Sequence, residues 1–224
     1  ARLADALGKD FSVPVLLDND ATNAAKGEFR FGAGKGCRNM LMITVGTGVG
    51  GGLILNGDVY HGASDYAGEI GHMIVVPSGR PCSCGNYGCL EAYSSGTAMV
   101  SYARWKNHKG VKSALSDYRD EQITPKLIED LAQAGDRSCR EILHHAGKYL
   151  GIALASLTNI LNLERCLIGG GVAQAGDYFF DPLYSYYGTY VLPEAANHCT
   201  IVKAELMNDA GIYGSAATVF MNND

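Results

Sequence analysis

The chain has 224 residues, an apolar fraction of 47% and a formal net charge of −5, which together predict a folded domain with a large buried core. The negative charge comes without a run of basic residues, so neither nucleic acid nor an anionic membrane surface is expected as a partner. No segment has the roughly 18 uninterrupted apolar residues of a membrane-spanning helix, and the first residues lack the layout of a secretory signal, so we expect a soluble, cytoplasmic protein.

The N-terminal part of the chain predicts a helix, a strand and a second helix. The pattern favours a helix over residues 3–11, a short apolar strand over 13–17 and a helix again over 21–31. Asp18, Asn19 and Asp20 follow the strand, which is the usual place of an active site in an α/β protein. A chain that starts on a helix leading into a strand indicates that an N-terminal segment precedes these residues.

Two further strands, over residues 39–45 and 52–56, flank a glycine-rich run from Gly46 to Gly51. The run matches G-x-G-x-x-G, but a dinucleotide site needs a helix after the glycines, and here a strand follows. We therefore expect a glycine-rich hairpin. Its amides and the Thr47 hydroxyl are suited to hold a phosphate, although a plain bulge or hairpin without a ligand gives the same pattern.

The rest of the chain predicts more helices than strands. Helical patterns cover residues 97–108, 124–134, 137–161 and 212–221, and strand patterns cover 165–168 and 199–205. Strands and helices mixed in this order predict an α/β fold. The run Gly169-Gly170-Gly171 marks a close approach of the backbone to a ligand or a neighbouring element, or a tight turn without a ligand.

The segment 72–91 contains one histidine and three of the seven cysteines. A set of three cysteines and one histidine is typical of tetrahedral zinc, and the glycines at 85 and 88 allow the loop to fold back on itself. Unliganded thiols are the alternative. Four protein ligands leave no open position, so the sequence predicts a structural zinc held by His72, Cys82, Cys84 and Cys89. The remaining cysteines are expected as reduced thiols, and they are Cys37, Cys139, Cys166 and Cys199.

Five motifs are spread along nearly the whole chain: Asp18-Asn19-Asp20-Ala21, Gly46-Thr-Gly-Val-Gly-Gly51, Ala67-Gly-Glu69-Ile-Gly-His72, Cys82-Ser-Cys84-Gly-Asn-Tyr-Gly-Cys89-Leu-Glu91 and Ile168-Gly-Gly-Gly-Val172. Together they resemble the ROK family of sugar kinases and sugar-responsive repressors. The resemblance implies the actin-like ATPase (ribonuclease H-like) fold, in which two lobes close over ATP and a hexose.

The resemblance also implies a role for each matching position. Asn19 and Asp20 would hold the sugar, with Asp20 as the base that accepts the proton of the attacking hydroxyl. Further sugar contacts would come from Glu69, His72 and Glu91, while Thr47 and Gly48 would contact the phosphates of ATP and Gly169 and Gly170 its adenosine. The structural alternatives are a helix N-cap for Asp20 and ordinary surface carboxylates for Glu69 and Glu91.

The activity implied is ATP-dependent phosphorylation of a hexose or N-acyl hexosamine at the 6-hydroxyl, with Mg²⁺ accompanying ATP and a homodimer as the expected assembly. The alternative is the sugar-sensing domain of a ROK-type repressor. Kinases of this family begin with an Asp-x-Gly-Gly-Thr motif, which is absent from the 224 residues. We therefore expect residues 1–224 to be the C-terminal lobe, with the zinc loop at 72–91 and with residues 211–224 packing toward an absent N-terminal lobe. This lobe alone is expected to be nearly inactive.

Overall fold

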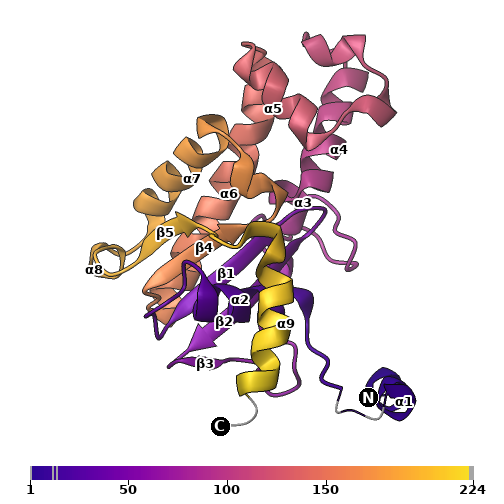
Figure 1. Ribbon diagram of the computed structural model, residues 1–224. Coiled ribbons are helices and arrows are strands. Elements are labelled where there is room, and N and C mark those ends of the chain that lie inside the picture. Colours follow the sequence, from indigo (N-terminus) through magenta and orange to yellow (C-terminus); the bar gives the residue numbers. More distant parts are fainter. Residues whose placement is uncertain (1, 12, 14, 222–224) are drawn as a thin grey trace.

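The computed structural model describes residues 2–11, 13 and 15–221, and within them the chain folds around a five-stranded sheet with helices on both faces (Figure 1). The strand order is β3-β2-β1-β4-β5. The first three strands form an antiparallel meander, and β4 and β5 run parallel to β1. The strands are β1 (Met40–Val45), β2 (Val49–Leu55), β3 (Asp58–Val59), β4 (Arg165–Gly169) and β5 (Thr200–Lys203). The predicted α/β fold class is therefore confirmed.

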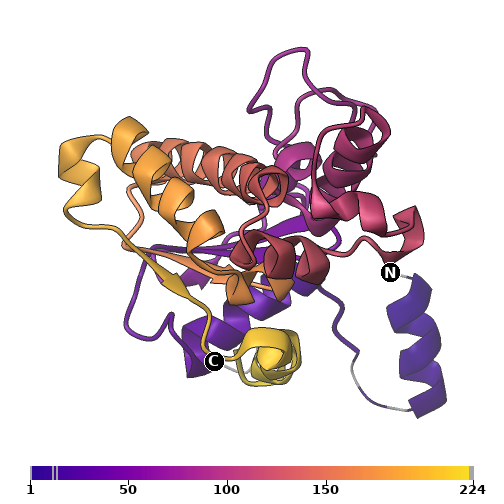
Figure 2. The same ribbon diagram turned by 90° about the horizontal axis from the view of Figure 1, so that it is seen from above.

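Two pairs of helices cover the sheet. On one face lie α6 (Arg137–Leu161) and α7 (Asp177–Tyr190), and on the other lie α2 (Asp20–Phe31) and α9 (Ala210–Met221) (Figure 2). Successive side chains of a strand point to opposite faces, so Leu41 and Ile43 join the larger core under α6, while Met42 joins the smaller core under α2. Burial on both faces explains why β1 is almost entirely apolar, with Thr44 as its one polar residue.

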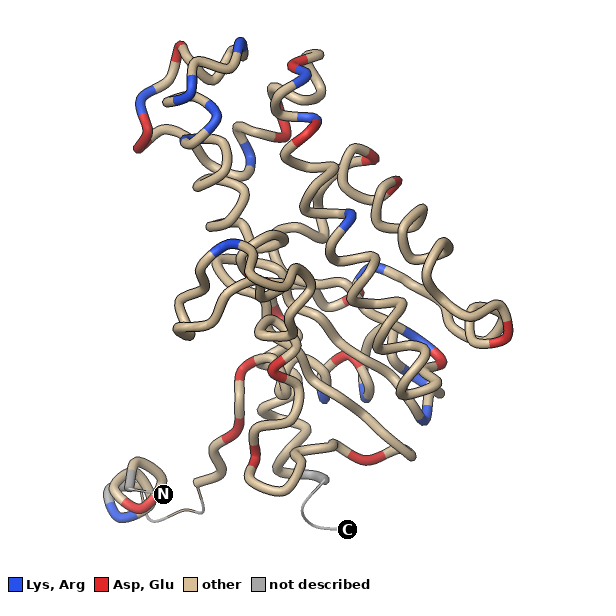
Figure 3. Tube along the Cα trace, turned by 180° about the vertical axis from the view of Figure 1, so that it is seen from behind, with Lys and Arg blue, Asp and Glu red and all other residues tan. Residues whose placement is uncertain are grey.

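The remaining helices lie beside the sheet or beyond it. A helical extension contains α3 (Glu91–Ser94), α4 (Gly96–His108) and α5 (Pro125–Gln133), and α8 (Pro193–Ala196) precedes β5. Lys and Arg are mixed with Asp and Glu at the far end of this extension (Figure 3), unlike the uniformly basic face of a nucleic-acid site. Among the described helices, none is both long and apolar enough to cross a membrane.

The strand predicted over residues 13–17 is wrong. Residues 15–19 are irregular, and the side chains of Leu16 and Leu17 are each 52% exposed. An apolar run becomes a strand only where a neighbouring sheet edge accepts its backbone hydrogen bonds, and this run lies beside no such edge. Helix α1 (Arg2–Phe11), which precedes it, stands apart from the other elements in Figures 1 and 2. Ser12 and Pro14 lie outside the described residues.

Helix α9 packs closely against α2 because glycines lie where the two helices touch. A methyl group on Gly27 would overlap the carbonyl of Ala210, and one on Gly214 would overlap the carbonyl of Asn23. The two helices therefore approach to backbone contact. The opposite side of α9 includes Ile212, which is 70% exposed. That residues 211–224 face a second lobe stays a prediction for this outer side, and residues 222–224 lie outside the described part of the chain.

Glu28 joins α2 to the segment before α9. Its side chain is fully buried, and its carboxylate accepts hydrogen bonds from the backbone N–H groups of Ala33 at 2.8 Å, Glu205 at 3.1 Å and Leu206 at 2.7 Å. Buried donors that lose their acceptor destabilise the folded state. This carboxylate therefore fixes the end of α2 against the start of the C-terminal helix.

Replacing Glu28 by glutamine should test that role. The amide keeps the shape but presents N–H groups to backbone donors, so we expect Glu28→Gln to lower the free energy of unfolding by about 1–3 kcal/mol. Urea unfolding measures the change, with Glu194→Gln as the control at an exposed carboxylate of α8. An equal, small effect of both substitutions would show that the Glu28 hydrogen bonds contribute nothing specific.

Candidate functional site

The glycines of β2 let two segments approach its opposite faces. A methyl group on Gly50 would lie 2.9 Å from the Cβ of Ala21, so the first turn of α2 rests directly on the strand. On the other face, a methyl group on Gly51 would lie 2.6 Å from the carbonyl oxygen of Gly68. The glycine-rich run therefore brings the start of α2 and the segment 67–72 to the same part of β2.

The turn between β1 and β2 is held from two sides. The Gly96 N–H donates to the carbonyl of Gly46 at 2.7 Å, and the Val49 N–H donates to Glu91 Oε2 at 3.0 Å. A methyl group on Gly48 would lie 2.5 Å from the same carboxylate oxygen. The run forms the predicted hairpin, followed by a strand and not by a helix, and it leaves Thr47 exposed at the tip.

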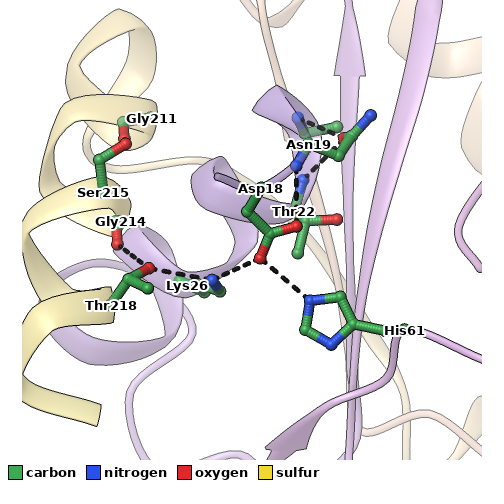
Figure 4. Close-up of polar contacts among 10 residues, drawn as sticks. Asp18, Asn19, Thr22, Lys26, His61, Gly211, Gly214, Ser215 and Thr218 are labelled. Carbon is green, nitrogen blue, oxygen red and sulfur yellow. Dashed lines mark hydrogen bonds and ion pairs between the residues drawn. The ribbon is translucent and has the colours of Figure 1, made fainter. Parts of the chain in front are cut away.

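Asn19, and not Asp20, is the N-cap of α2. Asn19 Oδ1 accepts hydrogen bonds from the N–H groups of Ala21 at 2.9 Å and Thr22 at 3.1 Å (Figure 4). Asp20 is the first residue of the helix, is exposed, and uses Oδ1 to accept from the Ala21 N–H at 2.8 Å. Among the described residues, no hydrogen bond or ion pair reaches its Oδ2. The alternative assignment of Asp20 as the N-cap is therefore wrong.

A polar network that the sequence analysis missed surrounds Asp18 (Figure 4). Asp18 Oδ2 lies 2.5 Å from Lys26 Nζ and 3.0 Å from His61 Nε2, and Oδ1 accepts from the Asn19 N–H at 2.7 Å. Lys26 Nζ also donates to Thr218 Oγ1 at 2.9 Å. Burial opposes the charge of Asp18, but the hydrogen bonds from Lys26 and His61 outweigh it, so the pKa of this carboxyl lies below its usual value.

The lowered pKa of Asp18 predicts a stability that depends on pH. Asp18 stabilises the fold fully above its unfolded pKa of about 3.9, and the contribution is lost as the pH falls through the lower folded pKa. Asp18→Asn should therefore lower the free energy of unfolding by about 1–2 kcal/mol near pH 6 and by less near pH 3. Urea unfolding at both pH values measures this. The exposed Asp58→Asn is the control, and a difference independent of pH would contradict the assignment.

The four predicted metal ligands lie together. The ligand atoms of His72, Cys82, Cys84 and Cys89 are all within 4.8 Å of one another. The two closest sulfurs, those of Cys84 and Cys89, are 3.6 Å apart, and His72 Nδ1 is 3.7 Å from Cys82 Sγ. Zinc–sulfur bonds of about 2.3 Å in a tetrahedron place sulfurs about 3.8 Å apart, so the residues present fit this ion.

Two carboxylates adjoin the metal-ligand cluster. His72 Nε2, the nitrogen that faces away from Cys82, is 3.9 Å from Glu69 Oε2. Glu91 Oε1 accepts from Ser83 Oγ at 3.2 Å, while its other oxygen holds the β1–β2 turn. Glu91 therefore links the cysteine loop to the glycine turn, and both of its oxygens have partners within the protein. Sequence reasoning treated Glu91 as a substrate contact or a surface residue and missed this link.

A cavity of about 870 Å³ lies between the glycine turn, the cysteine loop and α4. The candidate residues Thr47, Gly48 and Glu91 line one part of it. The lining as a whole is mainly apolar, and it includes Tyr102 and Trp105 of α4. The glycine turn and the cysteine loop therefore line the same cavity, while Asn19, Asp20 and Glu69 do not line it.

Gly169 is the last residue of β4 and Gly170 follows it, at the end of the sheet where the β1–β2 turn also lies. Thr44 of β1 pairs with Gly50 on one side and with Gly169 on the other. Gly170 has a φ of 77°, and a methyl group there would lie 2.5 Å from the carbonyl oxygen of Val45. The α2 start, the β1–β2 turn and these glycines therefore meet at the carboxyl ends of β1 and β4, where ligands bind in open α/β sheets.

Comparison with known proteins gives a family. A sequence model described as the ROK family matches residues 1–221. A glucokinase from Halalkalibacterium halodurans is 43% identical over 215 residues, which are 95% of this chain and 65% of that protein. The chain thus spans a little under two thirds of the length of this relative.

Solved structures of two kinds resemble the chain. A ROK family glucokinase from Streptomyces griseus, in complex with glucose and AMPPNP, aligns with a TM-score of 0.84 and 34% identity over 96% of this chain and 71% of that one. A ROK family transcriptional regulator, described as a homologue of the Escherichia coli MLC protein, aligns with a TM-score of 0.86 and 30% identity over 96% of this chain and 54% of that one.

Proposed function

The chain belongs to the ROK family and has the actin-like ATPase fold, and from this premise we propose that it is the C-terminal lobe of an ATP-dependent kinase for a hexose or N-acyl hexosamine. Similarity to a glucokinase along 95% of the chain supports a kinase. The Asn19-Asp20 pair at the start of α2 is the feature that carries the proposal, because Asp20 keeps one carboxylate oxygen without a partner among the described residues.

Asp20 is the general base in this proposal. A sugar hydroxyl is a weak nucleophile, and a carboxylate within hydrogen-bond reach accepts its proton as the hydroxyl attacks the γ-phosphate. Asn19 Oδ1 accepts the hydrogen bonds of the helix cap, so the amide Nδ2 is the group that remains to donate to a sugar oxygen. Glu69 and His72 would contribute further sugar contacts from the opposite face of β2.

The glycine turn and the end of β4 are proposed to bind ATP. Backbone N–H groups of Thr47 and Gly48 and the Thr47 hydroxyl would donate to the phosphates, and Gly169 and Gly170 would contact the adenosine. Mg²⁺ enters with ATP and offsets the charge on its phosphates. Catalysis of phosphoryl transfer rests mainly on such positioned donors, so an exposed turn pinned by Glu91 and Gly96 suits the task.

We assign the cluster at His72, Cys82, Cys84 and Cys89 to a structural zinc. The 4.8 Å limit on their ligand-atom separations supports this assignment. The ion would hold His72 through Nδ1, leaving Nε2 as an oriented donor, as is common for histidine ligands. It would also fix the loop that Glu91 ties to the glycine turn, and so support the sugar pocket from the side.

A sugar-sensing domain of a transcriptional repressor is the second candidate. The TM-score of 0.86 against a ROK regulator favours it as much as the glucokinase alignment favours a kinase. The Asn19-Asp20 pair favours the kinase, because a carboxylate beside a sugar hydroxyl is needed for phosphoryl transfer and not for sugar binding alone. The homodimer and the cytoplasmic location expected from the sequence stay predictions.

A sugar panel separates the two candidates. The full-length protein, in which an N-terminal lobe is joined to residues 1–224, is incubated with Mg²⁺, ATP and, in turn, glucose, mannose, N-acetylglucosamine and N-acetylmannosamine, and ADP release is followed. A kinase releases ADP with at least one sugar. Calorimetric binding of a sugar without any ADP release would overturn the kinase and favour the repressor domain.

A further inference from the structure

A buried lysine joins three segments of the chain near the proposed base. Lys26 is 5% exposed, and a lysine is rarely buried to this extent unless it is paired. Its ammonium group contacts Asp18 of the segment before α2 and Thr218 of α9 (Figure 4). One charged group thus connects the approach to α2, the body of α2 and the C-terminal helix.

The approach to α2 has little else to hold it. Residues 15–19 belong to no strand, and Leu16 and Leu17 are half-exposed. Asp18 fixes this segment through both oxygens, since Oδ1 accepts from the Asn19 N–H and Oδ2 contacts Lys26 and His61. Asp20 begins the helix two residues later, so its place depends on where this anchored segment enters α2.

We propose that Lys26 and Asp18 are positioning residues that set the place of the Asp20 carboxylate, an inference that rests on the kinase proposed above. A buried ion pair contributes little net stability, because desolvation of the charges offsets their attraction. Fixing one geometry is the better-attested role of such pairs. A displacement of the base by about 1 Å lowers turnover up to about 10²-fold.

Helix α9 is part of this arrangement. Gly27 and Gly214 allow the backbones of α2 and α9 to touch. Because the helices are this close, Thr218 of α9 accepts a hydrogen bond from Lys26 of α2. Thr218 Oγ1 also donates to the Gly214 carbonyl at 3.0 Å, which orients the hydroxyl as an acceptor for the ammonium. The C-terminal helix therefore influences the entry of α2 through Lys26.

The test compares two buried lysines in the full-length protein, in which an N-terminal lobe is joined to residues 1–224. Lys26→Met removes the anchor, and the control Lys106→Met removes a lysine that is 6% exposed and paired with Glu141 at 2.7 Å, away from α2. We expect Lys26→Met to lower kcat about 10- to 100-fold with the KM for the sugar changed less than about 3-fold. Lys106→Met should lower the melting temperature with kcat kept. An equal kcat for both variants, corrected for folded fraction, would overturn the proposal.

A second readout does not need turnover. The amides of Ala21 and Thr22 bond to Asn19, so their hydrogen exchange reports the order of the first turn of α2. We expect exchange to be about 10-fold faster in Lys26→Met and unchanged in Lys106→Met. If the wild-type protein phosphorylates no sugar, the proposed kinase activity is wrong, and hydrogen exchange alone tests the positioning role of Lys26. Unchanged exchange rates at Ala21 and Thr22 in Lys26→Met would overturn that role. If Lys26→Met does not fold, Thr218→Val removes one partner and should shift both readouts in the same direction.

Discussion

In the full-length protein, with an N-terminal lobe joined to residues 1–224, Asp20→Asn is expected to lower the turnover of sugar phosphorylation about 10²- to 10⁴-fold while the sugar binds within a few-fold of its wild-type affinity. Asparagine keeps the shape of the side chain and the acceptor for the Ala21 N–H, which Asp20 Oδ1 provides. It removes the carboxylate that we propose as the acceptor of the proton from the attacking hydroxyl. A steady-state assay with ATP and the preferred sugar, beside calorimetric sugar binding, measures both quantities.

The structure offers a matched control for this substitution. Asp177 begins α7 as Asp20 begins α2, and both are exposed acidic residues in the first turn of a helix. Loss of either charge weakens its interaction with the helix dipole by about 0.3–1 kcal/mol, so Asp177→Asn reproduces the structural effect without the chemistry. Turnover of Asp20→Asn close to that of Asp177→Asn would remove Asp20 from the mechanism.

The sequence predicts the features of this fold that depend on local pattern. The helix at residues 137–161 was predicted with its observed bounds, because its apolar stripe runs unbroken from the Asp136 N-cap to Asn162, which ends it with a φ of 50°. The pair Asn56-Gly57 favours a two-residue turn by its composition alone, and both residues have positive φ. The metal-ligand cluster was predictable for the same reason, since its four residues lie in one loop.

Features that depend on contacts between distant segments of the chain could not be predicted from the sequence. An apolar run at 13–17 has the composition of a strand, but no sheet edge pairs with it. Asp18, Lys26 and His61 come from three segments, so the spacing of these residues in the sequence does not predict their contact. Glu91 accepts a hydrogen bond from the Val49 N–H, 42 residues earlier in the chain, which a motif cannot reveal. A lysine on the buried stripe of α2 was the one local sign of the network.

The role of the glycine run shows how local and distant effects combine. Its composition predicts a hairpin able to bind phosphate, but each glycine also makes room for a different neighbour. Gly48 admits Glu91, Gly50 admits Ala21, and Gly51 admits the segment that carries Glu69 and His72. The same residues that open the turn to a ligand therefore assemble the other parts of the site around it.

Removing the metal ligand Cys84 is expected to affect sugar binding far more than ATP binding. Metal binding supplies folding free energy to small loops, so Cys84→Ser should lower the melting temperature and abolish binding of the proposed zinc. Loss of the ion frees His72 and the loop that Glu91 ties to the glycine turn. We expect the sugar affinity to fall about 10-fold or more. The glycine turn keeps the hydrogen bond from the Gly96 N–H to the Gly46 carbonyl, which does not involve the loop, so we expect the ATP affinity to change less than about 3-fold.

Three measurements on one variant separate this expectation from simple destabilisation. Zinc content is determined by elemental analysis, and sugar and ATP affinities by calorimetry at a temperature where the variant is folded. Cys37→Ser is the control, because Cys37 is a buried free thiol of the smaller core, outside the metal-ligand cluster. It should keep the zinc and both affinities. An unchanged sugar affinity in a zinc-free, folded Cys84→Ser variant would show that the cluster does not support the sugar pocket, because His72 and the Glu91 loop would then hold their places without the ion.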